Sequence, residues 1–233
     1  MTNIAKAIAD LPGSTESRPS GSDSVHWSIR VALAAWFLLV VSLGAAGAFI
    51  VSSGTPPFAI AIGALAPVAL FFVALRLSQE FRSFVLALDL RLIAAMQAWR
   101  WAGLGFLSLY AYGVLPGVFA LTAGLGDMAI GITAPWIVLA LVRDPGFAAN
   151  PRFRLWNVLG ILDLAVALSL GAISGVLATG APGEITAAPM GTLPLVLIPA
   201  FLVPLFLMLH GAALMQSRNA FLPEYREARS RPQ

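Results

Sequence analysis

The chain has 233 residues, of which 59% are hydrophobic and only 11% are charged, and its formal net charge is +3. A soluble domain carries about 25% charged residues, so this composition excludes an ordinary water-soluble globule and indicates a protein whose solvent is mostly lipid. Cysteine is absent, which excludes disulfides, thiolate metal sites and a cysteine nucleophile.

Residues 1–28 are predicted to form a disordered cytoplasmic tail. The stretch 12–24 is rich in serine, glycine and proline, a composition that buries too little apolar surface to fold. Acidic residues in the same region exclude a secretory signal peptide, which would place a short apolar run soon after its basic start.

Residues 29–216 are predicted to form an all-α, polytopic membrane bundle of six transmembrane helices. A spanning helix needs about 20 mostly apolar residues, and six segments meet this requirement. They run approximately from Ile29 to Val51, Pro57 to Leu77, Trp99 to Phe119, Leu125 to Val142, Leu155 to Leu177 and Leu193 to Gln216. Residues 217–233 follow as a basic cytoplasmic tail.

The distribution of basic residues supports this count. With six spans, all fourteen Lys and Arg residues fall on the side of the two termini, and the loops 52–56, 120–124 and 178–192 contain none. Cytoplasmic loops carry an excess of Lys and Arg. Both termini are therefore predicted to be cytoplasmic, in a multi-pass protein of a membrane such as the bacterial inner membrane.

The segment 80–97 has a different pattern, because it carries four charged residues among apolar residues at helical spacing. Two interpretations stay open. The segment is either an interfacial helix on the inner membrane surface or a cytoplasmic extension of the second or third span.

Asp163 is an acid in the middle of the fifth span. On a helix it shares a face with small residues, Gly160, Ala167 and Gly171, which allow another helix to approach closely. Its side chain is therefore predicted to point into the bundle. A charge at the bilayer centre costs about 2.5–3.5 kcal/mol on insertion scales, so Asp163 needs a partner, a proton or water.

The partners predicted for Asp163 are His210 in the sixth span and Arg100 at the start of the third. Asn157 and Gln97 lie near the same boundary. Together these residues are predicted to form a polar cluster in the cytoplasmic half of the bundle, with Asp163 facing His210, as a binding or proton site. The alternative is that Asp163 and His210 only hydrogen-bond two helices together.

Asp127 is a secondary candidate. If the fourth span begins near Leu125, Asp127 lies in the first turn, where the helix dipole favours an acid. It would then lie towards the opposite membrane face from Asp163, and the structural explanation is favoured over the functional one.

The sequence contains no motif that assigns a reaction. It lacks a Walker loop and a Cys/His ligand set for zinc, and a bis-histidine haem would need a second histidine within the spans. We therefore predict no catalytic residue, no metal and no cofactor, and favour a non-enzymatic role. Topology explains the basic loops, so no nucleic-acid partner is expected.

Three functions remain open. The first is transport of a small solute or ion, proton-linked in one version, with the cluster as its site. The second is an accessory or assembly subunit of a larger membrane complex, which predicts a dry Asp163–His210 contact and a groove for a membrane-protein partner. The third is a lipid-modifying or redox enzyme, which predicts a pocket of acyl width beside the cluster. Transport ranks first. Separately, Gly44 and Gly47 in the first span are small residues that would allow two copies of this helix to pack in a homodimer, or the helix to pack within the monomer.

Overall fold

The computed structural model describes residues 21–230, with side chains described from 27 to 218, and every regular element among these residues is helical. Among the described residues, five stretches are long and apolar enough to cross a membrane, which suggests a multi-pass membrane protein. They are Trp27–Ala45, Phe58–Leu77, Gly117–Arg143, Pro151–Leu177 and Ile198–Arg218.

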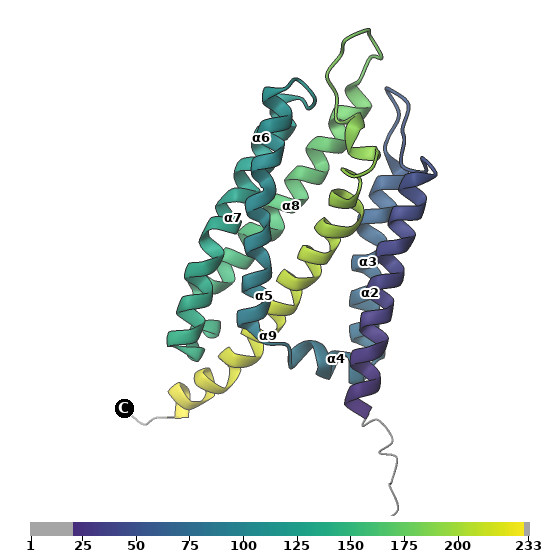
Figure 1. Ribbon diagram of the computed structural model, residues 1–233. Coiled ribbons are helices and arrows are strands. Elements are labelled where there is room, and N and C mark those ends of the chain that lie inside the picture. Colours follow the sequence, from purple (N-terminus) through teal and green to yellow (C-terminus); the bar gives the residue numbers. More distant parts are fainter. Residues whose placement is uncertain (1–20, 231–233) are drawn as a thin grey trace, which may run out of the picture.

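The last of these stretches is the central helix of the bundle. It comprises a π-helical turn, η4 (Ile198–Leu202), and the helix α9 (Val203–Ser230), and 50% of its span is buried, against 11–22% for the others. α7 (Gly117–Arg143) and α8 (Pro151–Leu177) lie on one side of α9, and α2 (Gly21–Ala45) and α3 (Phe58–Leu77) lie on the other (Figure 1).

The expected third span, Trp99–Phe119, is broken into pieces and begins earlier in the chain. α5 (Leu90–Met96), the 3-10 helix η1 (Gln97–Gly103) and α6 (Leu104–Ala111) follow one another directly and form one rod beside α7 (Figure 1). Each piece has eight residues or fewer, which is why five helices, not six, qualify by length.

The boundary between the third and fourth spans also differs from the expectation. α7 begins at Gly117, ahead of the predicted start near Leu125, and its N-cap is Pro116 in an extended conformation. Proline has no backbone N–H to donate to a preceding helix, so the chain turns before this residue and starts a new helix after it.

The segment 80–97 is not one helix, because most of it is divided between two helices. α4 (Gln79–Leu86) lies across the end of the bundle near α9 and α3 (Figure 1). The second half is α5, the first piece of the rod. Asp89 separates them, because its carboxylate accepts hydrogen bonds from the backbone N–H and Nε of Arg91 and caps α5.

The tails differ in part from the prediction. α2 begins at Gly21, so residues 21–28 are helical, whereas residues 1–20 lie outside the described residues. α9 continues to Ser230, through most of 217–233. The start of α2 and the end of α9 lie at one end of the bundle, called the terminus end below, and the connections 46–57, 112–116 and 178–197 lie at the other, the loop end (Figure 1).

Apolar side chains fill both ends of the bundle. At the terminus end the core includes Leu75, Leu141, Phe153 and Trp156. At the loop end it includes Phe106, Leu115, Phe119 and Met190. The polar residues considered next lie between these two cores.

Candidate functional site

Arg100 lies where the rod meets α7. A 3-10 helix has about three residues per turn, so Gln97, Arg100 and Gly103 fall on one face of η1, and all three are buried. This face packs closely on α7, because a Cβ added at Gly103 would lie 2.6 Å from Asp127 Cβ and 2.7 Å from Gly124 O. The tight helix and its glycine bring the arginine into the bundle.

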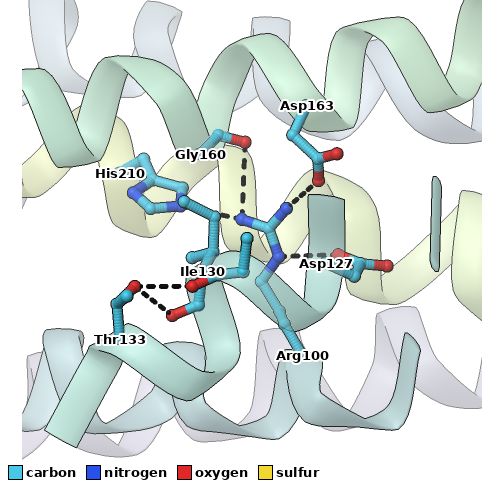
Figure 2. Close-up of polar contacts among 8 residues, drawn as sticks. Arg100, Asp127, Ile130, Thr133, Gly160, Asp163 and His210 are labelled. Atoms are coloured by element: carbon cyan, nitrogen blue, oxygen red, sulfur yellow. Dashed lines mark hydrogen bonds and ion pairs between the residues drawn. The ribbon is translucent and has the colours of Figure 1, made fainter. Parts of the chain in front are cut away.

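The Arg100 guanidinium connects three helices. Its Nε donates to Asp127 Oδ1 of α7 at 2.7 Å, and its Nη2 donates to Asp163 Oδ2 of α8 (Figure 2). Its Nη1 donates to the Gly160 carbonyl at 3.4 Å and lies 3.2 Å from His210 Nε2 of α9. Only 1% of the arginine side chain is exposed, so it is an internal counter-ion of the two acids.

His210 is fully buried, and its hydrogen bonds define its tautomer. Every guanidinium nitrogen is a donor, so His210 Nε2 accepts from Arg100 and the ring proton lies on Nδ1. Nδ1 then donates to Asn157 Oδ1 at 2.9 Å. The amide of Asn157 is oriented in turn, because its Nδ2 donates to the Phe153 carbonyl. The ring is therefore the neutral Nδ1–H form.

Three further glycines allow the helices of the cluster to approach. A Cβ at Gly160 would collide with the His210 ring, and one at Gly126 would collide with the Asp163 carboxylate. A Cβ at Gly131 would collide with the backbone at Trp101. Gly160, on the small-residue face seen in the sequence, and the two glycines of α7 therefore allow close packing of α7, α8, α9 and η1 around the polar groups.

The sequence did not identify Trp156 and Thr133 as neighbours of the cluster. Trp156 is buried, its ring is 5.6 Å from that of His210, and its Nε1 donates to Thr133 Oγ1 at 2.9 Å. The Thr133 hydroxyl donates to the backbone carbonyls of its own helix, at Ala129 or Ile130 (Figure 2). The only signal in the sequence was the position of Trp156 directly before Asn157.

Four of the five residues of the predicted cluster meet: Arg100, Asp163, His210 and Asn157. Asp163 and His210 do not face each other, because the Arg100 guanidinium lies between them (Figure 2). Gln97 is fully buried on the same face of η1, but its side-chain amide has no hydrogen-bond partner among the described residues. Asp163 lies near the midpoint of α8, and the sequence had placed it in the middle of the fifth span.

The predicted position of Asp127 in the first turn of its helix is wrong. α7 begins at Gly117, so Asp127 lies well inside the helix and the dipole at a helix start does not explain it. It binds the same guanidinium as Asp163. The two acids therefore lie together and not towards opposite faces.

An apolar cavity of about 410 Å³ lies beside the cluster, within the size range of small-molecule sites. α3 and α8 form its walls, and η4 and α9 form its back. It runs from Ser53 and Thr186 at the loop end to Asp127, the one ionisable residue among the described residues that line it. Leu65 of α3 and Ala165 of α8 line it and are exposed, so it also opens sideways between these helices.

The two acids are partly exposed, whereas the arginine is buried. The side chains of Asp127 and Asp163 are 16% and 13% exposed, against 1% for Arg100. Among the described residues, no group of three His, Asp or Glu side chains lies together as a metal site would require. The arrangement is suited to accepting a proton or a hydrogen-bond donor at a carboxylate.

Residues 57–218 match a family described as a domain of unknown function (DUF8737). The chain belongs to this family. The DUF8737 region extends from the residue before α3 into α9, so it contains the whole polar cluster and most of the cavity. No curated protein and no solved structure matches the chain.

Proposed function

We propose that this chain is a membrane transporter with six spans that binds a small lipophilic solute in the cavity between α3 and α8. The observation that carries the proposal is the cavity, which opens at the loop end and between two helices and ends at an ionisable side chain in mid-bundle. Ionisable residues at membrane depth commonly mark substrate or ion pathways.

The closed end of the cavity supports transport. Towards the terminus end the helices are joined by a packed core that includes Leu75, Leu141 and Trp156. In alternating access, the binding site is open to only one side of the membrane at a time. A cavity that is closed towards the terminus end meets this requirement. The back wall contains the π-helical turn η4, and such turns are common at functional sites and where helices bend.

The proposed orientation places the terminus end in the cytoplasm, as in a bacterial inner-membrane protein, with the rod as the sixth crossing. Two observations support it. The start of α2 and the end of α9 lie at the same end of the bundle (Figure 1). The connections at the loop end, 46–57, 112–116 and 178–197, contain no Lys or Arg.

Labelling of a single cysteine in the cavity tests transport. The chain has no native cysteine, so Ala167→Cys, at a residue that lines the cavity, would be the only thiol. In oriented proteoliposomes we expect a membrane-impermeant thiol reagent to reach it from either side, because the cavity opens alternately to each. Exposed residues provide the controls: Ala181→Cys should react only from the loop end and Ser83→Cys only from the terminus end. If Ala167→Cys reacts from the loop end alone, the cavity is a binding site that opens to one side, and the transport proposal is overturned.

A lipid-modifying enzyme is the second candidate, because the cavity meets the requirement of an apolar pocket beside the cluster. Incubation of the purified protein with membrane lipids, followed by mass spectrometry, tests it. A new lipid species that depends on Asp127 would favour this candidate over transport.

A further inference from the structure

The polar cluster carries an unbalanced charge. Asp127 and Asp163 both bind Arg100, and His210 is neutral in the tautomer that its hydrogen bonds define. With both acids ionised, the net charge is therefore −1. The charged group that faces these acids is Arg100 from η1, and the neutral His210 of α9 lies on the other side of the guanidinium. The described side chains of α3 contribute no ionisable group to the cavity.

An unbalanced charge inside a membrane bundle is costly. The desolvation of an ion in apolar surroundings is compensated only by a partner of opposite charge or by loss of the charge. The site is therefore stable when one acid is protonated or when a cation lies beside it.

Asp127 is the acid that a ligand can reach. Its carboxylate lines the cavity, whereas Asp163 packs against Gly126 and is not among the lining residues. Arg100 holds Oδ1 of Asp127, and the second oxygen points away from the guanidinium (Figure 2). Because Asp127 lines the cavity, this oxygen is left to accept from a donor inside it.

We infer that the cavity takes an amphiphile with an apolar body and a cationic N–H head, such as an arylalkylammonium ion, whose head displaces a proton from Asp127. The carboxyl O–H bond breaks, the proton goes to water, and the ammonium N–H donates to the carboxylate, so the charge of the site stays balanced. An anionic head is disfavoured because the buried guanidinium of Arg100 is already occupied by two acids. The inference rests on the proposed function and names its substrate class.

Three probes with the same body and different heads test the inference: 4-phenylbutylamine, 4-phenylbutanol and 4-phenylbutyrate. Their binding to the purified full-length protein would be measured by calorimetry in buffers of different ionisation enthalpy, which also counts released protons. We expect the amine to bind about tenfold or more tightly than the alcohol. Below the pKa of the amine, we expect about one proton to be released per amine bound, with affinity rising with pH.

Two variants locate the site. Asp127→Asn keeps an oxygen for Arg100 but removes the charge, so the amine should lose its advantage over the alcohol. Glu80→Gln removes an exposed acid of α4 and should change neither affinity. Ala172→Phe, within the cavity, should abolish binding of all three probes, whereas Val158→Phe, on the exposed face of α8, should not.

The outcomes separate the two proposals. Equal affinity for amine and alcohol, without proton release, would overturn the cationic substrate class and leave the lipophilic site intact. Failure of all three probes to bind would overturn the proposed function as well. If Asp127→Asn does not fold, the comparison of the three heads and the proton count on the wild-type protein decide the question.

Discussion

Arg100 is the residue on which the cluster depends, because it is the shared partner of two buried acids. Removing one member of a buried ion pair costs about 3–5 kcal/mol, mostly because the remaining charge is left without a partner. We therefore expect Arg100→Met to lower the free energy of unfolding by about that amount, measured in mixed detergent micelles.

The matched control for Arg100→Met is Arg91→Met, which removes an exposed arginine paired with Asp89. Exposed pairs contribute little, so its effect should be much smaller. Adding Asp127→Asn and Asp163→Asn to Arg100→Met should recover most of the lost stability, since no charge is then left unpaired. If the triple variant is no more stable than Arg100→Met, the acids are not what makes the arginine necessary.

The tautomer of His210 is a second expectation at the residue scale. Because Nε2 accepts from Arg100 and Nδ1 donates to Asn157, ¹⁵N chemical shifts of the imidazole at pH 7 should indicate a protonated Nδ1 and an unprotonated Nε2. Asn157→Asp should keep this tautomer, because a carboxylate also accepts from Nδ1–H. A ring protonated at Nε2 would contradict the assigned contact with Arg100.

The sequence indicated the site residues better than it indicated their contacts. Asp163, Arg100 and His210 could be predicted because each is an ionisable residue in apolar surroundings. The position of Arg100 between Asp163 and His210 could not be predicted, because it depends on the three-residue period of η1. Asp127 was misjudged because its interpretation rested on a helix boundary, and boundaries are the least certain part of a sequence-based assignment.

Close approach at glycine governs the packing of helices around the cluster. A methyl group at Gly160 would meet the His210 ring, which is fully buried and cannot move aside easily. We expect Gly160→Ala to destabilise the protein by about 1–3 kcal/mol, the usual cost of overpacking. Gly105→Ala is the control, because nothing lies within 4 Å of a Cβ at that position of α6, and the change should be neutral or stabilise by about 0.4–1 kcal/mol. Equal effects of the two changes on SDS-induced unfolding would contradict the packing argument.

The loop 178–187 provides an expectation about pH. Hydrogen bonds from the Thr179 backbone N–H and hydroxyl, with a further one from Gly180 N–H, hold the pKa of Glu184 below its ordinary value of 4.5. A lowered pKa means that the contribution of Glu184 to stability is complete above about pH 4.5 and is lost as pH falls through the lowered value. Wild type should therefore exceed Glu184→Gln in Tm at neutral pH, with the difference shrinking in acid. If the Tm difference between wild type and Glu184→Gln grows as the pH falls, the hydrogen bonds do not stabilise the ionised form of Glu184.

At the scale of elements, the long helices could be predicted and the segmented rod could not. α3 and α8 agree closely with the expected spans because each is a continuous apolar run between residues that end helices. The rod combines α5, η1 and α6, and its first piece had been assigned to the charged segment 80–97. Asp89 is the physical reason, because a capped helix start there divides that segment in two.

The whole molecule is two groups of helices joined by α9. The rod, α7 and α8 lie on one side of α9, and α2 and α3 lie on the other (Figure 1). The rod, α7 and α8 contribute Arg100, Asp127 and Asp163 to the polar cluster, and α3 lines the cavity opposite α8. α9 contacts both groups, and its π-helical entry lies in the wall of the cavity. α9 also carries His210 of the cluster, in contact with Arg100. The motion that the proposed transport requires would therefore move the pair α2–α3 relative to α9 and the cluster.

The number of crossings depends on whether the rod spans the membrane. If it does, Ala87, before α5, and Tyr112, after α6, lie on opposite sides. Both are exposed, so Ala87→Cys and Tyr112→Cys are informative in a chain without native cysteine. Intact cells treated with an impermeant maleimide should modify Tyr112→Cys at once and Ala87→Cys only after permeabilisation. Modification of both in intact cells, or of neither, would mean that the rod does not cross. The chain would then have five crossings, with its two termini on opposite sides of the membrane.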